Sequence, residues 1–130
     1  MSSSRASRRY INLPGREPPL PFSDGVLVGD TLYLAGRIGI DPTTRVAPAD
    51  IEQEIKFLFD GFAAVLKQAE MTMDDLVWVQ IFSPDVSLWD RFNREYVKRF
   101  KKEFPARAFL GSGPLLRGAR FEMMGTAVKR

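Results

Sequence analysis

The 130-residue chain contains neither cysteine nor histidine. The lack of cysteine excludes disulfides, thiolate metal ligands and cysteine nucleophiles. The lack of histidine excludes serine–histidine–aspartate triads, histidine-ligated zinc and histidine general bases. Any chemistry must therefore depend on arginine, lysine, carboxylates, tyrosine, hydroxyl groups or the backbone.

Long apolar runs are absent as well. No uncharged apolar segment is long enough to span a bilayer, and the N-terminus has no apolar core of a secretory signal. We therefore expect a cytoplasmic protein with no membrane partner. With 45% hydrophobic and 27% charged residues, a chain of this length has room for one globular domain with a single core.

Excess positive charge is confined to the first ten residues. The net charge is +3, and Arg5, Arg8 and Arg9 account for it, because the rest of the chain has 16 basic and 16 acidic residues. A nucleic-acid-binding domain should carry a basic face, so we expect no nucleic-acid partner. The serine- and arginine-rich start is similar to part of a transit peptide, but it is short and has no amphipathic stripe. We predict a disordered N-terminal tail and irregular lead-in over residues 1–20, and a single domain over residues 21–130.

Hydrophobic periodicity predicts the elements of the first half. Residues 25–28 and 31–35 are apolar runs joined by Gly29-Asp30, a pair that suits a tight hairpin turn. Asp50 fits the N-cap of a helix that runs to about residue 69. The apolar face of this helix recurs at steps of three and four residues: Ile51, Ile55, Leu58, Phe62, Val65, Leu66 and Ala69.

The second half continues the pattern. Residues 76–82 form the strongest predicted strand, with apolar side chains on both faces: Val77, Val79 and Ile81 on one, Leu76, Trp78 and Phe82 on the other. A second helix is expected over residues 87–102, with a buried face made of Trp89, Phe92, Tyr96 and Phe100. Strands over residues 108–113 and 119–128 complete the order β-β-α-β-α-β-β.

This order predicts an α+β fold in which two helices cover one face of a sheet. Trp78 and Phe82 would lie on the other face, and a chain of this size has nothing left to bury them. An exposed apolar face is a liability, so we expect identical subunits to cover it. The sequence thus predicts a homo-oligomer.

Arg107 is the leading candidate for a functional residue. Its neighbourhood, residues 104–110, is otherwise wholly apolar. An arginine there is partly desolvated and needs an anionic partner. Two partners remain open from the residues alone: a structural ion pair with a carboxylate of the chain, or the carboxylate of a ligand, which the guanidinium geometry matches bidentately.

Several motifs recur in order along the chain: Gly36-Arg37-Ile38-Gly39, Asn93-x-x-Tyr96, Phe104-Pro105-Ala106-Arg107, and Leu116-Arg117-Gly118-Ala119 followed by Glu122 and Ala127-Val128. In sequence and spacing they resemble the RidA (YjgF) family of enamine/imine deaminases, over about residues 21–130. The proline–alanine–arginine segment is the most specific of these motifs.

The resemblance implies a chorismate-mutase-like α+β fold with a mixed sheet, assembled as a homotrimer with three clefts between subunits. It also implies that Arg107 holds the carboxylate of a small reactive 2-imino acid. Water then attacks the C=N carbon and releases a 2-oxo acid and ammonia. No metal or organic cofactor takes part.

The C-terminal strand departs from the family pattern. Active deaminases usually read Glu-Ile-Glu-Ala there, and the second glutamate orients the attacking water. This chain reads Glu122-Met123-Met124-Gly125, so Met124 replaces that glutamate. Glu122 matches the first family glutamate. It lies two residues before Met124, about 7 Å away along the strand, which is too far for it to replace the missing glutamate without rearrangement.

Four further positions, Phe22, Gly36, Arg37 and Asn93, belong to the implied site. Phe22 replaces the tyrosine of a Pro-Tyr-Ser segment, which removes a hydroxyl. Beside Gly36, Arg37 replaces a glutamine; it either forms a salt bridge or adds a second anion contact that favours a dicarboxylate. Asn93 is either a solvated helix residue or, as the resemblance implies, a residue bordering the cleft.

Two functions follow from these observations. The first is hydrolytic, cofactor-independent deamination of a small imino or enamine acid. The alternative is a non-catalytic trimer that binds small carboxylate metabolites, and Met124 is the residue that separates the two. The ribonuclease label of some family members finds little support in a chain without histidine and without a basic stripe on its domain.

Overall fold

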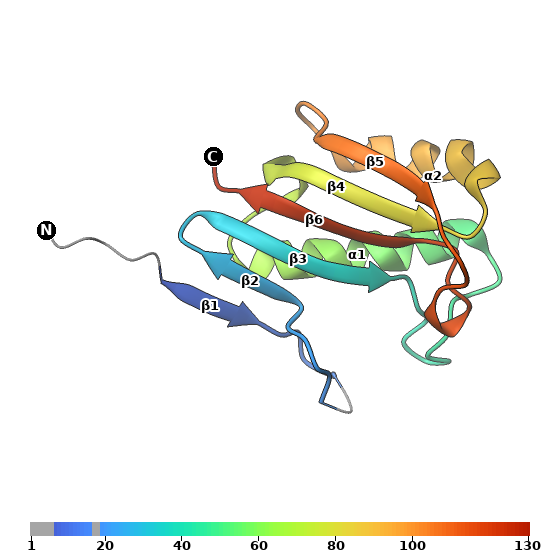
Figure 1. Ribbon diagram of the computed structural model, residues 1–130, viewed down its shortest axis with the longest axis horizontal. Coiled ribbons are helices and arrows are strands. Elements are labelled where there is room, and N and C mark those ends of the chain that lie inside the picture. Colours follow the sequence, from blue (N-terminus) through green and yellow to red (C-terminus); the bar gives the residue numbers. More distant parts are fainter. Residues whose placement is uncertain (1–6, 17–18) are drawn as a thin grey trace, which may run out of the picture.

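The computed structural model describes residues 7–16 and 19–130. These residues form a six-stranded sheet in the order β1-β2-β3-β6-β4-β5, with both helices packed on one face (Figure 1). β4 and β5 run parallel and the other neighbours run antiparallel, so the sheet is mixed. The elements are β1 (Arg8–Ile11), β2 (Gly25–Val28), β3 (Thr31–Ile38), α1 (Ile51–Gln68), β4 (Leu76–Ser83), α2 (Trp89–Tyr96), β5 (Ala106–Gly111) and β6 (Glu122–Val128). The predicted α+β class is confirmed.

β1 lies in the segment that the sequence analysis assigned to a tail. It pairs antiparallel with β2 and supplies one buried side chain, Ile11. The three residues before Ile11 are exposed, so the segment has no repeating apolar pattern from which a strand could be predicted. The prediction of a tail is therefore wrong for residues 8–11, while Arg5 lies outside the described residues.

α1 forms where its start signal predicts. The Asp50 side chain accepts a hydrogen bond from Glu52 N at 3.0 Å, which confirms the N-cap. The helix ends at Gln68, one residue before the predicted limit. Its apolar face packs against the sheet through Ile55, Leu58, Phe59, Phe62, Val65 and Leu66.

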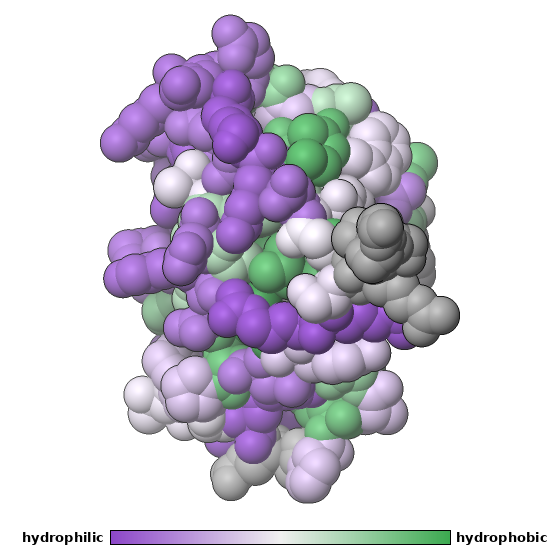
Figure 2. All heavy atoms as spheres, turned by 90° about the vertical axis from the view of Figure 1, so that its left-hand side faces the viewer, coloured by the Kyte–Doolittle hydropathy of each residue, from purple (hydrophilic) through white to green (hydrophobic). Residues whose placement is uncertain are grey.

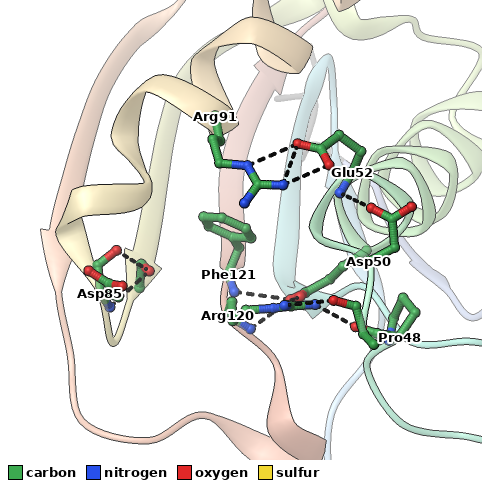
Figure 3. Close-up of polar contacts among 10 residues, drawn as sticks. Pro48, Asp50, Glu52, Asp85, Arg91, Arg120 and Phe121 are labelled. Carbon is green, nitrogen blue, oxygen red and sulfur yellow. Dashed lines mark hydrogen bonds and ion pairs between the residues drawn. The ribbon is translucent and has the colours of Figure 1, made fainter.

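α1 also buries a charged residue that the sequence analysis did not single out. Glu54 is fully buried and accepts hydrogen bonds from Arg120 N and Nε, both at 2.6 Å, and from Phe121 N at 3.3 Å. The Arg120 guanidinium also donates to the carbonyls of Pro48 and Ala49 (Figure 3). This network fastens the loop before α1 to the segment that enters β6.

β4 carries apolar side chains on both faces, but its alternation is interrupted. Its pairing with β6 shifts between Leu76 and Trp78, which places Val77 at the irregularity. Val77 is 48% exposed and Leu76 only 4%, so neither lies on the face that the alternation predicted, because an extra residue in one strand reverses the facing of its neighbours. On the face away from the helices, the open face, Trp78 is 39% exposed and Tyr33 is 54% exposed. A single chain thus leaves this face apolar and uncovered, as expected.

The second helix is shorter than the predicted range 87–102. α2 lies between two short 3-10 turns, and helical structure ends at Arg99. Tyr96 is buried as expected, but Trp89 is 47% exposed. Trp89 begins the helix and lies edge-on against Phe109 of β5, with 5.3 Å between ring centres. Its side chain therefore borders the surface beside β5.

The end of the molecule that carries the C-terminus and the β2–β3 turn is mainly hydrophilic. Apolar residues occur there in small separate patches (Figure 2). No helix within residues 7–16 and 19–130 is long and apolar enough to cross a membrane. This end of the molecule therefore offers no broad apolar surface comparable with the open face.

Candidate functional site

Arg107 lies inside β5 and points to the helical side of the sheet. β5 begins at Ala106, two residues before the predicted strand, and Arg107 pairs in register with the buried Val79 of β4. Paired residues on neighbouring strands share a face, so Arg107 faces α2. Its guanidinium carbon lies 4.8 Å from the ring centre of Trp89 and 4.5 Å from that of Tyr96. Two aromatic rings therefore hold the cation.

An open cavity of about 310 Å³, the Arg107 cavity, is lined by Asn93, Tyr96, Val97, Phe104, Pro105 and Arg107. Among the described residues, four buried side-chain polar atoms have no hydrogen-bond partner, and three belong to this cavity: Asn93 Oδ1, Tyr96 Oη and Arg107 Nη1. Buried polar atoms are nearly always hydrogen-bonded. Free donors and acceptors around one cavity indicate a place for a polar ligand.

Arg107 has no carboxylate partner in the part of the chain that the structure describes. The structural ion pair that the sequence left open is therefore not formed among these residues. Burial lowers the pKa of the Arg107 guanidinium, and Tyr96 offsets part of this shift. Burial also raises the pKa of the Tyr96 hydroxyl to about 12. At neutral pH the cavity contains an unpaired cation beside a neutral hydroxyl.

Glu122 and Met124 point to the open face, because Met123 between them is fully buried in the core. Gly36 of β3 lies beside Glu122: a Cβ at position 36 would be 2.3 Å from Glu122 Oε2 and would displace the carboxylate. Arg107 and Met124 thus lie on opposite faces of the sheet. A single chain does not bring them into one cavity.

Arg37 has a partner within the chain. Its Nη2 lies 3.3 Å from Asp24 Oδ1, and its side chain packs against Gly61 of α1. Burial lowers the pKa of Arg37, and the Asp24 carboxylate opposes this shift. Phe22 is half-exposed, and the Arg16 guanidinium carbon lies 5.1 Å from its ring centre. For Arg37 the geometry matches the salt-bridge interpretation.

The predicted site residues form three groups rather than one: Asn93 with Arg107, Gly36 with Glu122 and Met124, and Phe22 with Arg37. Tyr96 and Arg16 were not assigned to the site from the sequence. Tyr96 follows Asn93 by three residues on α2, a spacing that places both on one side of a helix. No local pattern points to Arg16. Within the described residues, no cluster of three or more side chains could hold a metal ion.

The fold and the Arg107 cavity together define a class, namely a small α+β protein with an open pocket that contains an arginine side chain. The family model described as Endoribonuclease L-PSP matches residues 15–129. The chain belongs to this family and is a RidA-type member of it. The resemblance seen in the sequence is confirmed.

The similarity to individual proteins extends over most of the chain. A RutC family protein of Saccharolobus solfataricus is 35% identical over 114 residues, which are 87% of this chain and 90% of that protein. The 2-iminobutanoate/2-iminopropanoate deaminase of Homo sapiens is 30% identical over 110 residues, 84% of this chain and 80% of the human protein. The crystal structure of YyfA, a Rid family protein of unknown function from Yersinia pestis, is similar with a TM-score of 0.86 and 28% identity, and the match covers 95% of this chain and 100% of that one.

Proposed function

We propose that this protein is a trimeric RidA-type deaminase that hydrolyses a small 2-imino acid, or its enamine form, to a 2-oxo acid and ammonia. The observation that carries the proposal is the Arg107 cavity, where an unpaired guanidinium lies beside unpartnered polar atoms of Asn93 and Tyr96. The deaminase name of the human relative supports the same chemistry.

In this proposal Arg107 binds the substrate carboxylate. A guanidinium presents parallel N–H donors that match a carboxylate bidentately. Trp89 and Tyr96 contact the guanidinium with their rings, and Arg107 Nη1 has no hydrogen-bond partner among the described residues, so its N–H donors are left for a ligand. A 2-imino acid bound in this way has its C=N carbon one bond from the carboxylate and therefore inside the cavity.

Hydrolysis then needs only water as a second reactant. Water adds to the C=N carbon, and the nitrogen takes up one of its protons. The resulting carbinolamine transfers the hydroxyl proton to nitrogen as the C–N bond breaks, which releases ammonia and the 2-oxo acid. Asn93 Oδ1 accepts a hydrogen bond from the attacking water. The hydroxyl of Tyr96 keeps its proton because its pKa is raised to about 12, and it donates to the substrate nitrogen.

The complete site lies between subunits in this proposal. Arg107 and Met124 are on opposite faces of the sheet, so a site that contains both positions requires two chains. The open face, with Trp78 and Tyr33 exposed, supplies a surface for the second chain. A closed ring of three chains then has three equivalent clefts.

The test is an imine hydrolysis assay. A dehydratase acting on serine generates 2-iminopropanoate in situ, and a trapping reagent reports its lifetime. The wild-type protein should shorten that lifetime, and Arg107→Ala should lower kcat/KM by about 10²-fold or more, because the substrate loses its orientation. Arg94→Ala, which removes an exposed arginine of the same helix layer, is the matched control and should keep full activity.

Each failure has its own meaning. Acceleration that survives in Arg107→Ala would overturn the site. No acceleration by the wild-type protein, with several imino acids tested, would overturn the deaminase function. The second candidate would then remain, a trimer that binds small carboxylate metabolites without chemistry. Met124 in place of the water-orienting glutamate is the observation that favours it.

A further inference from the structure

A second cavity lies at the other edge of the sheet. The Arg16 cavity is open, has a volume of about 530 Å³ and is lined by Asn12, Arg16, Pro19, Leu20, Phe22 and Ser23. Its lining residues are described residues from between β1 and β2, whereas those of the Arg107 cavity lie in α2, in β5 and between these two elements. β1 and β5 are the two outer strands of the sheet (Figure 1). The residues that line the two cavities therefore lie near opposite edges of the sheet.

Two arginines beside this cavity share one carboxylate. Asp24 Oδ1 lies 3.3 Å from Arg37 Nη2 and 3.9 Å from Arg16 Nε. Asp24 Oδ2 is already used, because it accepts a hydrogen bond from Leu13 N at 2.8 Å. The side chains of Arg37, Arg16 and Asp24 are only 26%, 16% and 7% exposed, so solvent screens them weakly. No other acid among the described residues pairs with either arginine, and the group carries one positive charge in excess.

Of the two arginines, Arg16 is the one with a buried polar atom that forms no hydrogen bond to the described residues. Its Nη1 donates to Asn12 Oδ1 and its Nη2 to the Phe22 carbonyl, but its buried Nε has no hydrogen-bond partner within residues 7–16 and 19–130. Burial is the main cause that lowers the pKa of Arg37, and the charge of Arg16 lowers it further, against the opposing effect of Asp24. An anion in the Arg16 cavity would therefore relieve a repulsion that one carboxylate leaves uncompensated.

A ring of identical chains joins different surfaces of neighbouring subunits. The Arg107 cavity at one edge and the Arg16 cavity at the other are two such surfaces, and each is open and cationic. An anionic ligand with two acidic groups would compensate both charges at once. A single chain does not bring these two cavities together, since they lie at opposite edges of its sheet.

On the basis of the proposed deaminase function, we propose that Arg16 of one subunit faces the Arg107 cavity of the next and binds a second acidic group of the substrate. The substrate class is then 2-imino acids with a carboxylate on the side chain. Arg107 holds the carboxylate next to the imine, and Arg16 holds the distal one. Leu20 and Phe22 offer apolar contacts to the methylene groups between them.

The proposed substrate class can be tested by measuring the binding of stable 2-oxo acids, which are the products of the proposed reaction or analogues of them. 2-Oxoglutarate and 2-oxopentanoate have the same chain length and differ in the distal group, a carboxylate in one and a methyl group in the other. Calorimetry with the wild-type protein should give a dissociation constant about tenfold lower for 2-oxoglutarate, since a charged hydrogen bond contributes on this scale. Equal affinity for the two acids would overturn the proposal.

Variants assign the preference to a residue. Arg16→Gln should weaken 2-oxoglutarate binding to the level of 2-oxopentanoate and leave 2-oxopentanoate binding nearly unchanged. Arg37→Gln should also reduce the preference, because Asp24 then neutralises Arg16 alone, and it serves as the second variant if Arg16→Gln does not fold. Arg8→Gln removes an exposed arginine of β1 and is the control that should keep the preference. Equal weakening of both acids by Arg16→Gln would contradict a role in binding the distal group.

Mixed trimers test whether two subunits share the site. Arg107→Ala and Arg16→Gln chains, unfolded together and refolded as an equal mixture, should regain tight 2-oxoglutarate binding at about a quarter of the clefts, because random closure of a ring pairs an intact Arg107 with an intact Arg16 at that frequency. A trimer made of either variant alone should show no tight binding of 2-oxoglutarate. No recovery in the mixture would overturn the placement of Arg16 in the neighbouring subunit.

The two proposals fail separately. A protein that prefers 2-oxoglutarate through Arg16 but hydrolyses no imine would retain the second anion contact and lose the deaminase function. A protein that hydrolyses 2-iminopropanoate and 2-iminoglutarate equally well, with no effect of Arg16→Gln on either, would retain the deaminase function and lose the second contact.

Discussion

Arg107 is available to a ligand because of the side chains around it. A carboxylate partner would occupy its in-plane N–H donors, whereas Trp89 and Tyr96 contact it through their rings. Cation–π contact stabilises a partly buried charge without using those donors. The aromatic neighbours thus stabilise the Arg107 guanidinium without neutralising its charge, whereas a carboxylate partner would neutralise it.

At the scale of one residue, Met124 is the position on which the two proposed functions, deaminase and binding protein, differ. In the RidA pattern a glutamate at this position orients the attacking water. We expect Met124→Glu to raise kcat for imine hydrolysis on the order of 10²-fold, because a positioned acid/base group contributes roughly 10²–10⁴-fold. The in situ imine assay, run over a range of protein and substrate concentrations, gives kcat and KM separately.

Met124→Gln is the matched control for this prediction, since glutamine has nearly the same size and no basic carboxylate. It should leave kcat close to the wild-type value. Equal gains from glutamate and glutamine would mean that polarity rather than proton transfer matters at this position. No gain from glutamate would show that position 124 takes no part in the chemistry.

At the scale of elements, two ion pairs of α1 differ in their exposure to solvent. Arg120 pairs with the fully buried Glu54, whereas Arg91 and Glu52, which also pair, have side chains that are 42% and 43% exposed (Figure 3). Removing one partner of a buried pair leaves an uncompensated charge, which is far more costly than loss of an exposed pair. The Glu54–Arg120 pair therefore sets how the segment before β6 is attached to α1.

Arg120→Ala should lower the free energy of unfolding by about 3 kcal/mol, because Glu54 then keeps only its backbone donors. Arg91→Ala removes the exposed partner of Glu52 and should leave the free energy of unfolding nearly unchanged. Urea denaturation of the two variants and the wild-type protein measures both effects. Equal losses in the two variants would show that burial of Glu54 is not what makes its pair important.

The elements were predictable where a local pattern exists. The α1 face, the hairpin turn at Gly29-Asp30 and the alternation of β4 from Trp78 onward follow from spacing in the sequence. β1 was missed because Ile11 is its one buried side chain, and a strand with one buried residue has no period. Val77 was misplaced because a bulge depends on the partner strand and leaves no mark in the sequence of β4.

At the scale of the whole molecule, the open face is the feature that a single chain leaves unfinished. The helices cover one side of the sheet, and Trp78 and Tyr33 remain exposed on the other. Burying such a face against other copies removes apolar surface from water. The proposed trimer follows from this surface and from the separation of Arg107 and Met124 by the sheet.

Trp78→Asp should convert the proposed trimer to monomers, because it places an unpaired charge in the interface. Analytical ultracentrifugation should then show the mass of one chain, 14.7 kDa, in place of three times that value. Ala63→Asp adds the same charge to the exposed side of α1 and should keep the trimer. Imine hydrolysis should be lost with the trimer, and a fully active monomer would contradict a site built from two subunits.

The sequence by itself determined the α+β class, the main helix and strands, the apolar surroundings of Arg107 and the RidA resemblance, because these depend on local spacing and on residue identity. Only the tertiary structure decided that Arg107 has no carboxylate partner among the described residues, that Met124 faces the other side of the sheet, and that Arg16 and Arg37 share Asp24. These facts depend on strand register and on contacts between segments far apart in the chain. No local pattern encodes such contacts, so the partner of a buried charge becomes known only when the chain has folded.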